Sequence, residues 1–324
     1  LWYLLITILG WMIFPLAYSL FTKLADRGYT LARVFGLMLW GYVFWLSASL
    51  GFVKNDIAGL SFYLIVVGGL GVWLLLSHKT EILGWVDGNK KIIITTEVLF
   101  LFSFVLFTFF RSANPEIIGT EKPMELMFIN GIINSSTFPP RDLWLSGYSI
   151  SYYYFGYVIT AMLAKLTYTP ATAAFNLMLS LIFSLSAIGA YGLLYNFLAI
   201  HAVEYLPLTQ RKPNITFQAL LGPFFLLVIS NVEGFLEVLH TRGLFWQSGA
   251  NFWTWLDIPE LREAPPPPLT SLIPQRLGWW WWRASRVIMD YDFNSKWTGD
   301  VINEFPAFSF ILGDLHPHVI SILF

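Results

Sequence analysis

The sequence predicts an all-α fold: a polytopic transmembrane helical bundle, with two long outer loops that contain interfacial helices. Of its 324 residues, 56% are hydrophobic and only 12% are charged, against about 25% charged in a typical soluble domain. Several apolar runs reach the roughly 20 residues that a helix needs to cross a bilayer. Fifteen tryptophans and fifteen tyrosines fit a protein with broad water–lipid boundaries, where amphipathic rings gather.

Charge and cysteine content narrow the possible partners. The net charge is −1 and no basic patch stands out, so we expect no nucleic-acid partner. The chain has no cysteine, which excludes disulfides and thiolate metal sites.

Apolar runs follow one another along the chain with polar links between them. The residues at 1–21 lack a charged start and a small-residue cleavage site, so they predict a span and not a signal peptide. The first residue is Leu1 and the last, Phe324, falls inside an apolar run, so we expect a fragment of a longer polypeptide. The predicted spans are 1–21, 32–53, 57–77, 92–110, 171–200 and 215–230, and a further apolar run begins at 307.

Basic residues in the short links set the expected topology, because lysine and arginine favour the cytoplasmic side. The links with Lys23 and with Lys79 are both inside if residue 1 starts outside, which places loop 111–170 outside. The short segment 152–166 then decides the rest: if it crosses the membrane, loop 231–306 lies inside. We prefer the alternative, in which this tyrosine-rich segment lies along the outer surface and both loops face out, because every basic link then lies inside.

Two sets of side chains could carry chemistry. Glu121 and Glu125 lie four apart and share a face of a helix that starts near 120, although their spacing alone favours acids at a solvated helix start. Asp314, His316 and His318 alternate, so an extended segment would direct all three into one cavity. Carboxylate and imidazole together suit a divalent cation; the alternative is that the histidines cap a span.

The second loop adds weaker signals. Asp290 and Asp292 form an Asp-x-Asp pair, a common but unspecific way to hold Mg²⁺. The prolines at 265–268 predict a polyproline II segment. The tryptophans at 279–282 predict an interfacial anchor, with a platform for a sugar or lipid chain as the alternative.

Several motifs together resemble a known family. They are Glu121-Lys122-Pro123, Phe138-Pro139-Pro140, Tyr152-Tyr153-Tyr154-Phe155-Gly156 and, far downstream, Gly313-Asp314-Leu315-His316-Pro317-His318. From about residue 92 onward, the chain resembles an uncharacterised membrane protein family named for its triple tyrosine. That family is in turn distantly similar to the GT-C glycosyltransferases, such as oligosaccharyltransferase and protein O-mannosyltransferase.

The GT-C resemblance implies roles for particular residues. Glu121 matches the acid of the first outer loop, and 152–166 matches a surface helix that follows it. Asp314 is the preferred match to a second acid, with Arg286 beside Asp290 or Asp292 as the alternative. The chain departs from the pattern at Glu121-Lys122, where GT-C enzymes often have two acids. Residues 1–91 do not match the core and are expected to be an added module before a C-terminally incomplete module at 92–324.

The expected function is transfer of a sugar from a polyprenyl-phosphate donor to an acceptor at the outer face of the plasma membrane. Catalysis is assigned to Glu121 and Asp314, and a Mg²⁺ or Mn²⁺ ion to Asp314, His316 and His318. The expected substrate-binding residues are Lys122, Arg141, Asp142, Tyr152, Tyr153, Tyr154 and Arg286. Expected partners are the polyprenyl-phosphate sugar or another lipid, membrane lipids and other membrane subunits.

Two other functions compete with this one. A non-catalytic scaffold or subunit of a larger membrane complex is the main alternative. A transporter is least favoured, because the predicted spans hold few of the ionisable groups that a transport path needs.

Overall fold

The computed structural model of the chain describes residues 1–205, 215–229, 231–246, 252–264 and 280–324, and it is mostly helical. The described chain forms two compact units, one of residues 1–226 with 313–324 and one of residues 227–312. Each unit is described by itself.

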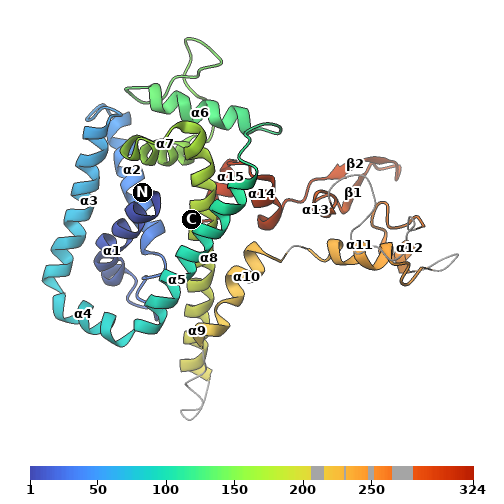
Figure 1. The fold of residues 1–324 in the computed structure, drawn as a ribbon, viewed down its shortest axis with the longest axis horizontal. Coiled ribbons are helices and arrows are strands. Elements are labelled where there is room, and N and C mark those ends of the chain that lie inside the picture. The colour runs from blue at the N-terminus through green and yellow to red at the C-terminus, as the bar shows by residue number, and fades with distance from the viewer. Residues whose placement is uncertain (206–214, 230, 247–251, 265–279) are drawn as a thin grey trace. The chain divides into compact units, whose positions relative to one another are not determined.

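The first unit is a bundle of helices (Figure 1). Among the described residues, four helices are long and apolar enough to cross a membrane: α1 (Trp2–Leu20), α3 (Ile57–Ser77), α5 (Lys90–Ala113) and the Ala171–Ala202 part of α8 (Ala171–Tyr205). They confirm helices at four predicted spans. The remaining helices of this unit are α2 (Ala32–Ser49), α4 (Lys79–Gly88), α6 (Lys122–Asn134), α7 (Phe155–Thr167), α9 (Ile215–Gln218), α10 (Leu221–Leu227) and α15 (Pro317–Ser321).

Three predicted apolar spans differ from the structure. α2 has 18 residues but contains Arg33 and falls outside the four span-length apolar helices. The run at 215–227 forms two short helices, α9 and α10, instead of one span. The run from 307 breaks at Gly313, whose φ of 73° lies in the left-handed region that favours glycine, and at Pro317, which begins α15.

α1 and α3 pack at close range because α3 carries glycines where they meet. A Cβ atom built on Gly71 would lie 1.8 Å from the backbone oxygen of Met12, and one built on Gly68 would lie 2.0 Å from the Met12 side chain. Helices in membranes associate through small residues of this kind, because lipid supplies no hydrophobic drive between them. The sequence Val67-Gly68-Gly69-Leu70-Gly71 therefore sets the α1–α3 distance.

α5 and α8 run antiparallel. Near one end, Arg111 Nε donates to Asn176 Oδ1 at 3.0 Å, and Phe107 stacks on Phe183 with ring centroids 4.5 Å apart. Near the other end, Tyr191 of α8 lies beside Thr95 of α5. The chain therefore leaves α5 and enters α8 at the same end of the bundle. The segment that connects them, which includes α7, does not cross the bundle.

α6 and α7 lie across the end of the bundle where Arg111 contacts Asn176, while α3 and α8 run away from that end (Figure 1). The start of α1 lies at the same end, because Trp2 Nε1 donates to Thr167 Oγ1 at 3.0 Å. The segment predicted to lie along the outer surface forms α7, whose residues 157–164 are all buried in the protein. α7 packs against α2, α6, α8 and α15, so its apolar residues serve the protein core.

One ion pair lies inside the predicted spans. The Arg33 side chain of α2 is 2% exposed, and its Nη2 contacts both carboxylate oxygens of Glu97 of α5, the nearer at 2.5 Å. Tyr29 also donates to Glu97, and the guanidinium lies 4.6 Å from the Phe100 ring centroid. The expectation that the spans hold few ionisable groups overlooked this pair.

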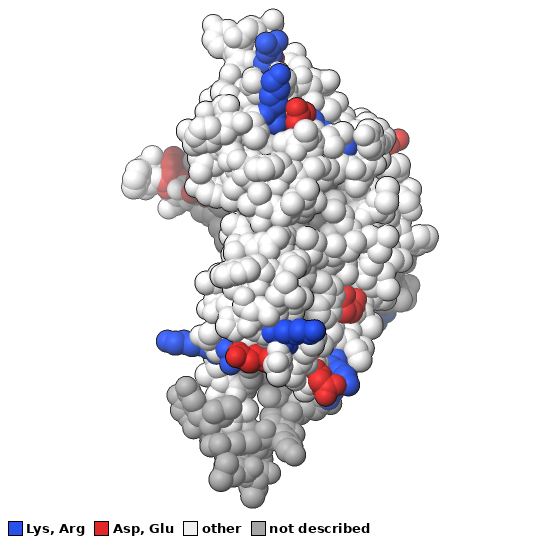
Figure 2. All heavy atoms as spheres, turned by 90° about the vertical axis from the view of Figure 1, so that its left-hand side faces the viewer, with Lys and Arg blue, Asp and Glu red and all other residues white. Residues whose placement is uncertain are grey.

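The outer face formed by α3 and α4 has the surface expected of a protein that lies in a membrane. Figure 2 shows charged side chains gathered toward two ends of this face, with a largely uncharged band between them. Phe62, Ile65 and Trp73 of α3 are exposed in the structure. Such a band suits contact with lipid chains.

The second unit contains α11 (Glu233–Thr241), α12 (Phe252–Leu256), α13 (Trp280–Ala284), α14 (Pro306–Leu312) and the antiparallel strands β1 (Ile288–Tyr291) and β2 (Trp297–Val301). The hairpin corrects the all-α prediction. The turn is held by Asp292, whose Oδ1 accepts from the backbone N–H groups of Asn294 and Lys296 at 2.8 and 2.9 Å. Residues 265–268 and Trp279 lie outside the described part of the chain.

Candidate functional site

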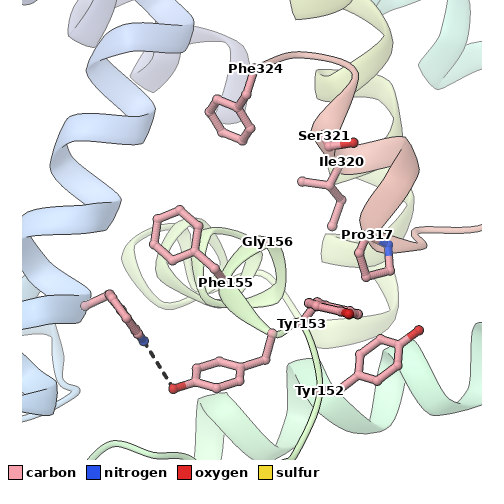
Figure 3. A pocket seen from close by; sticks show the side chains of 10 residues that line it. Tyr152, Tyr153, Phe155, Gly156, Pro317, Ile320, Ser321 and Phe324 are labelled. Carbon is pink, nitrogen blue, oxygen red and sulfur yellow. Dashed lines mark hydrogen bonds between the residues drawn. The ribbon is translucent and has the colours of Figure 1, made fainter.

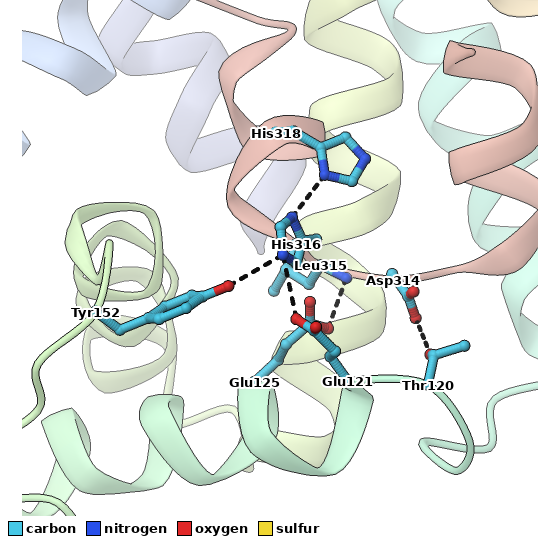
Figure 4. A network of polar contacts seen from close by, with 8 residues as sticks. All are labelled: Thr120, Glu121, Glu125, Tyr152, Asp314, Leu315, His316 and His318. Atoms are coloured by element: carbon cyan, nitrogen blue, oxygen red, sulfur yellow. Dashed lines mark hydrogen bonds and ion pairs between the residues drawn. The ribbon is translucent and has the colours of Figure 1, made fainter. Parts of the chain in front are cut away.

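Three segments that are distant in sequence meet at the α6–α7 end of the first unit. They are the start of α6 with Thr120, Glu121 and Glu125, Tyr152 before α7, and the segment 313–318 (Figure 4). The contacts join residues up to 194 positions apart. The two sets of side chains singled out in the sequence therefore lie together.

The backbone of 313–318 explains how its side chains spread. Gly313 takes a left-handed φ of 73°, and His316 is extended, as expected before a proline, with φ −62° and ψ 149°. The Leu315 N–H is directed at α6, where Glu125 Oε2 accepts it at 2.8 Å. This bond ties the middle of the Asp314-Leu315-His316 sequence to the helix that carries Glu121.

His316 connects Glu121, Tyr152 and His318. Its Nε2 lies 3.1 Å from Glu121 Oε2 and 3.0 Å from the Tyr152 hydroxyl, and its Nδ1 lies 2.6 Å from His318 Nδ1. One Nδ1 atom must carry the shared proton. If His318 donates it, His316 Nε2 is protonated and donates to Glu121; if His316 donates it, Nε2 accepts from Tyr152. The hydrogen-bonded side chains around His316 can thus hold their protons in two arrangements without moving a heavy atom.

Glu125 is the least accessible acid of the site. Its side chain is fully buried, and burial raises its pKa from 4.5 to about 8. The charges of Asp314 and Glu121 raise it as well, while the Leu315 N–H and Lys122 act in the opposite direction. Among the described residues, neither Glu125 Oε1 nor the nearby buried Tyr157 hydroxyl has a hydrogen-bond partner. We therefore expect Glu125 to be mostly protonated at neutral pH.

Asp314 lies between a hydroxyl and two cations. Thr120 Oγ1 donates to Asp314 Oδ1 at 2.6 Å, and the carboxylate attracts Arg111 and Lys122. A Cβ on Gly313 would lie 2.4 Å from Arg111 Nη1, so the guanidinium is packed against this glycine. Burial lowers the pKa of Lys122, and the charge of Asp314 partly offsets that effect. Asp314 is 8% exposed, so its charge acts in a sheltered setting.

The three predicted metal ligands do not lie together as one ligand set. Asp314 Oδ1 is bonded to Thr120, whereas His316 and His318 contact each other through their Nδ1 atoms. No group of three or more His, Asp or Glu side chains suited to a metal ion occurs within the described ranges. The divalent metal stays a prediction.

An aromatic cavity of about 380 Å³ adjoins the polar cluster (Figure 3). Trp45 Nε1 donates to the Tyr154 hydroxyl at 3.3 Å on one wall. A Cβ on Gly156 would lie 2.5 Å from Ile320 Cδ1, so this glycine lets α15 approach α7. The lining residues are Trp45, Tyr152, Tyr153, Tyr154, Phe155, Gly156, Pro317, Ile320, Ser321 and Phe324.

The other predicted substrate-binding residues have local roles in the structure. Asp142 Oδ1 accepts from the backbone N–H groups of Trp144 and Leu145 and so holds a turn. Arg141 bridges Ser149 through its backbone. Arg286 belongs to the second unit, where its guanidinium lies 3.8 Å from the Trp282 ring centroid.

Sequence reasoning gave no specific role to three residues of the site. Glu125 was noted only for its spacing from Glu121, and Arg111 only as the start of a loop. Thr120 was considered solely as a helix start. The available signal was a lone arginine directly after the apolar run at 92–110, since a charge at the edge of a span needs a partner.

Comparison with known proteins gives a family and nothing finer. The profile of a family described as uncharacterized membrane protein (DUF2298) matches residues 39–324. Neither the comparison with curated proteins nor the comparison with solved structures found a match. The GT-C resemblance therefore rests only on the residues quoted for it.

Proposed function

We propose that the chain, which belongs to the DUF2298 family of uncharacterized membrane proteins, is a glycosyltransferase that uses a polyprenyl-phosphate sugar. One observation carries this proposal: Glu121, Asp314 and His316 converge beside an aromatic cavity, although Glu121 is distant in sequence from the other two. A carboxylate, an imidazole and two cations around a sheltered opening are groups that transfer from a phosphate ester can use.

Glu121 is the best-placed general base. Its side chain is 54% exposed, so an acceptor hydroxyl can reach it, and His316 holds one of its oxygens. In the proposed step the acceptor oxygen bonds to the anomeric carbon and its proton passes to Glu121. The bond between that carbon and the phosphate oxygen breaks, and polyprenyl phosphate leaves with the electron pair. A positioned base of this kind typically contributes about 10²–10⁴-fold to the rate.

Lys122 and Arg111 are the described cations nearest to where the leaving phosphate would sit. Burial lowers the pKa of Lys122, and a phosphate beside it would favour the charged form. Asp314 orients these cations and is itself held by Thr120. Arg141, also expected to bind substrate, stays part of the proposal as a contact of the remaining donor. Arg286, which lies in the second unit, stays a prediction from the sequence.

The aromatic cavity suits the first isoprene units of the lipid. Its walls carry tyrosine, tryptophan and phenylalanine rings with few polar atoms. A Mg²⁺ or Mn²⁺ ion near Asp314 and His316 would offset charge on the leaving phosphate. In this proposal the α6–α7 end faces the outside of the plasma membrane. A scaffold or subunit role is the alternative if no transfer occurs.

The test measures sugar transfer from a radiolabelled polyprenyl-phosphate sugar by the full chain in lipid nanodiscs, with and without a chelator. Glu121→Gln and Asp314→Asn should each reduce transfer by about 10²-fold or more while the melting temperature stays near that of the wild type. Glu116→Gln, at an exposed glutamate ahead of the site, is the matched control. Full activity in both site variants refutes the assignment, and an unchanged rate in chelator refutes the metal.

A further inference from the structure

α11 has its polarity reversed relative to a helix in water. Glu233, Glu237 and His240 lie on its buried side, with exposures of 3%, 1% and 0%. Val232, its N-cap, is 70% exposed and Phe235 is 64% exposed. A surface helix of a soluble domain shows the opposite arrangement, with the apolar stripe inside and charges outside.

The buried polar side is held by specific partners. The Arg283 guanidinium of α13 binds both carboxylate oxygens of Glu237, and its Nη1 lies 3.5 Å from Glu260 Oε2. His240 Nε2 lies 2.7 Å from the backbone oxygen of Glu263. Separating the Glu237–Arg283 pair would leave a buried charge without its counter-ion, which is strongly destabilising. The contacts on this side therefore fix which side of α11 faces out.

More exposed aromatic rings follow α11 in the sequence. The rings of Phe245, Phe252 and Trp255 form a contiguous row, with neighbouring centroids 5.7 and 6.0 Å apart. Phe245 is 63% exposed and Trp255 is 77% exposed. Large exposed aromatic groups of this kind mark a surface that contacts a partner or a membrane.

We propose that Val232, Phe235, Phe245 and Trp255 insert into the interfacial region of the bilayer. The chain favours lipid as the occupant, because α10 ends at Leu227 and the apolar stretch 215–227 precedes α11 by only a few residues. Tryptophan and phenylalanine are also the side chains that settle at membrane interfaces. This assignment is independent of the glycosyltransferase proposal and places the start of loop 231–306 in lipid instead of water.

The absence of cysteine allows single labels to test this. Phe235→Cys and Trp255→Cys, each carrying the fluorophore NBD, are compared with Asn294→Cys in the exposed hairpin turn. The full chain is placed in phosphatidylcholine vesicles that contain either doxyl-labelled lipid or aqueous iodide. Both substitutions replace exposed side chains, so we expect the fold to be retained, and a thermal melt checks this.

The expected result is quenching by doxyl lipid at 235 and 255 that exceeds the quenching at 294 by at least about twofold, with little iodide quenching. Quenching by iodide and not by doxyl lipid at both test positions places this surface in water and overturns the proposal. Protection from both quenchers also overturns it, because the surface is then covered by protein.

Discussion

Glu125 should contribute to the pH dependence of the chain's stability, and this contribution should vanish in Glu125→Gln. Burial raises the Glu125 pKa from 4.5 to about 8, so between these values the folded state holds a proton that the unfolded state has lost. The stabilisation from Glu125 is therefore fully present below about pH 4.5, is lost progressively as pH rises, and is gone above about pH 8. The slope is about 1.4 kcal/mol per pH unit, and the full loss is about 5 kcal/mol.

Glutamine isolates this effect because it is neutral and has nearly the same shape. Its side-chain oxygen can still accept the Leu315 N–H, but its amide nitrogen would occupy the buried place of Oε1, which has no partner among the described residues. A buried group without a partner costs about 1–3 kcal/mol at every pH. We therefore expect Glu125→Gln to be no more stable than the wild type at pH 5 and clearly more stable at pH 9.

The measurement is the free energy of unfolding of the full chain in mixed micelles at pH 5 to 9. Glu116→Gln, at an exposed position, should keep the wild-type slope. Equal slopes in wild type and Glu125→Gln would refute the reasoning, since the pH dependence would then come from other groups.

Three further predictions concern packing and pairing. Gly156→Ala should displace Ile320, which a Cβ would approach to 2.5 Å, and lower stability by about 1–3 kcal/mol; transfer should fall as α15 shifts, and a normal melting temperature would contradict this. Gly71→Ala should disrupt α1–α3 packing more strongly, because its Cβ would meet the Met12 backbone oxygen at 1.8 Å; thermal melts compare it with Gly69→Ala, where no atom lies within 4 Å of an added Cβ. Arg33→Met alone should lower the free energy of unfolding by about 3–5 kcal/mol, because it leaves Glu97 without its ion-pair partner in the span. The double variant with Glu97→Leu should recover most of this loss in the same unfolding assay. An additive loss would show that the pair is unimportant.

The sequence was a good guide where a property is local. A run of about 20 apolar residues is stable as a helix that crosses a bilayer, so the helices α1, α3, α5 and α8 could be predicted from length and composition. Segment 152–166 forms α7, which has 13 residues and is shorter than the span-length helices; that it lies along the outer surface stays a prediction. The Gly313–His318 sequence, with a glycine, a proline and three polar groups inside an apolar run, does not form a continuous helix in the structure.

Only the tertiary structure decided which groups meet. The sequence placed Glu125 four residues from Glu121, but its bond to the Leu315 N–H, 190 positions away, depends on how α6, α7 and α15 pack. The burial of α7, the hairpin at 288–301 and the reversed polarity of α11 were likewise not visible in the pattern of residues. Hydrophobic length is a property of a segment alone, whereas the pKa of a carboxyl group and the exposure of a helix face depend on neighbours from distant segments.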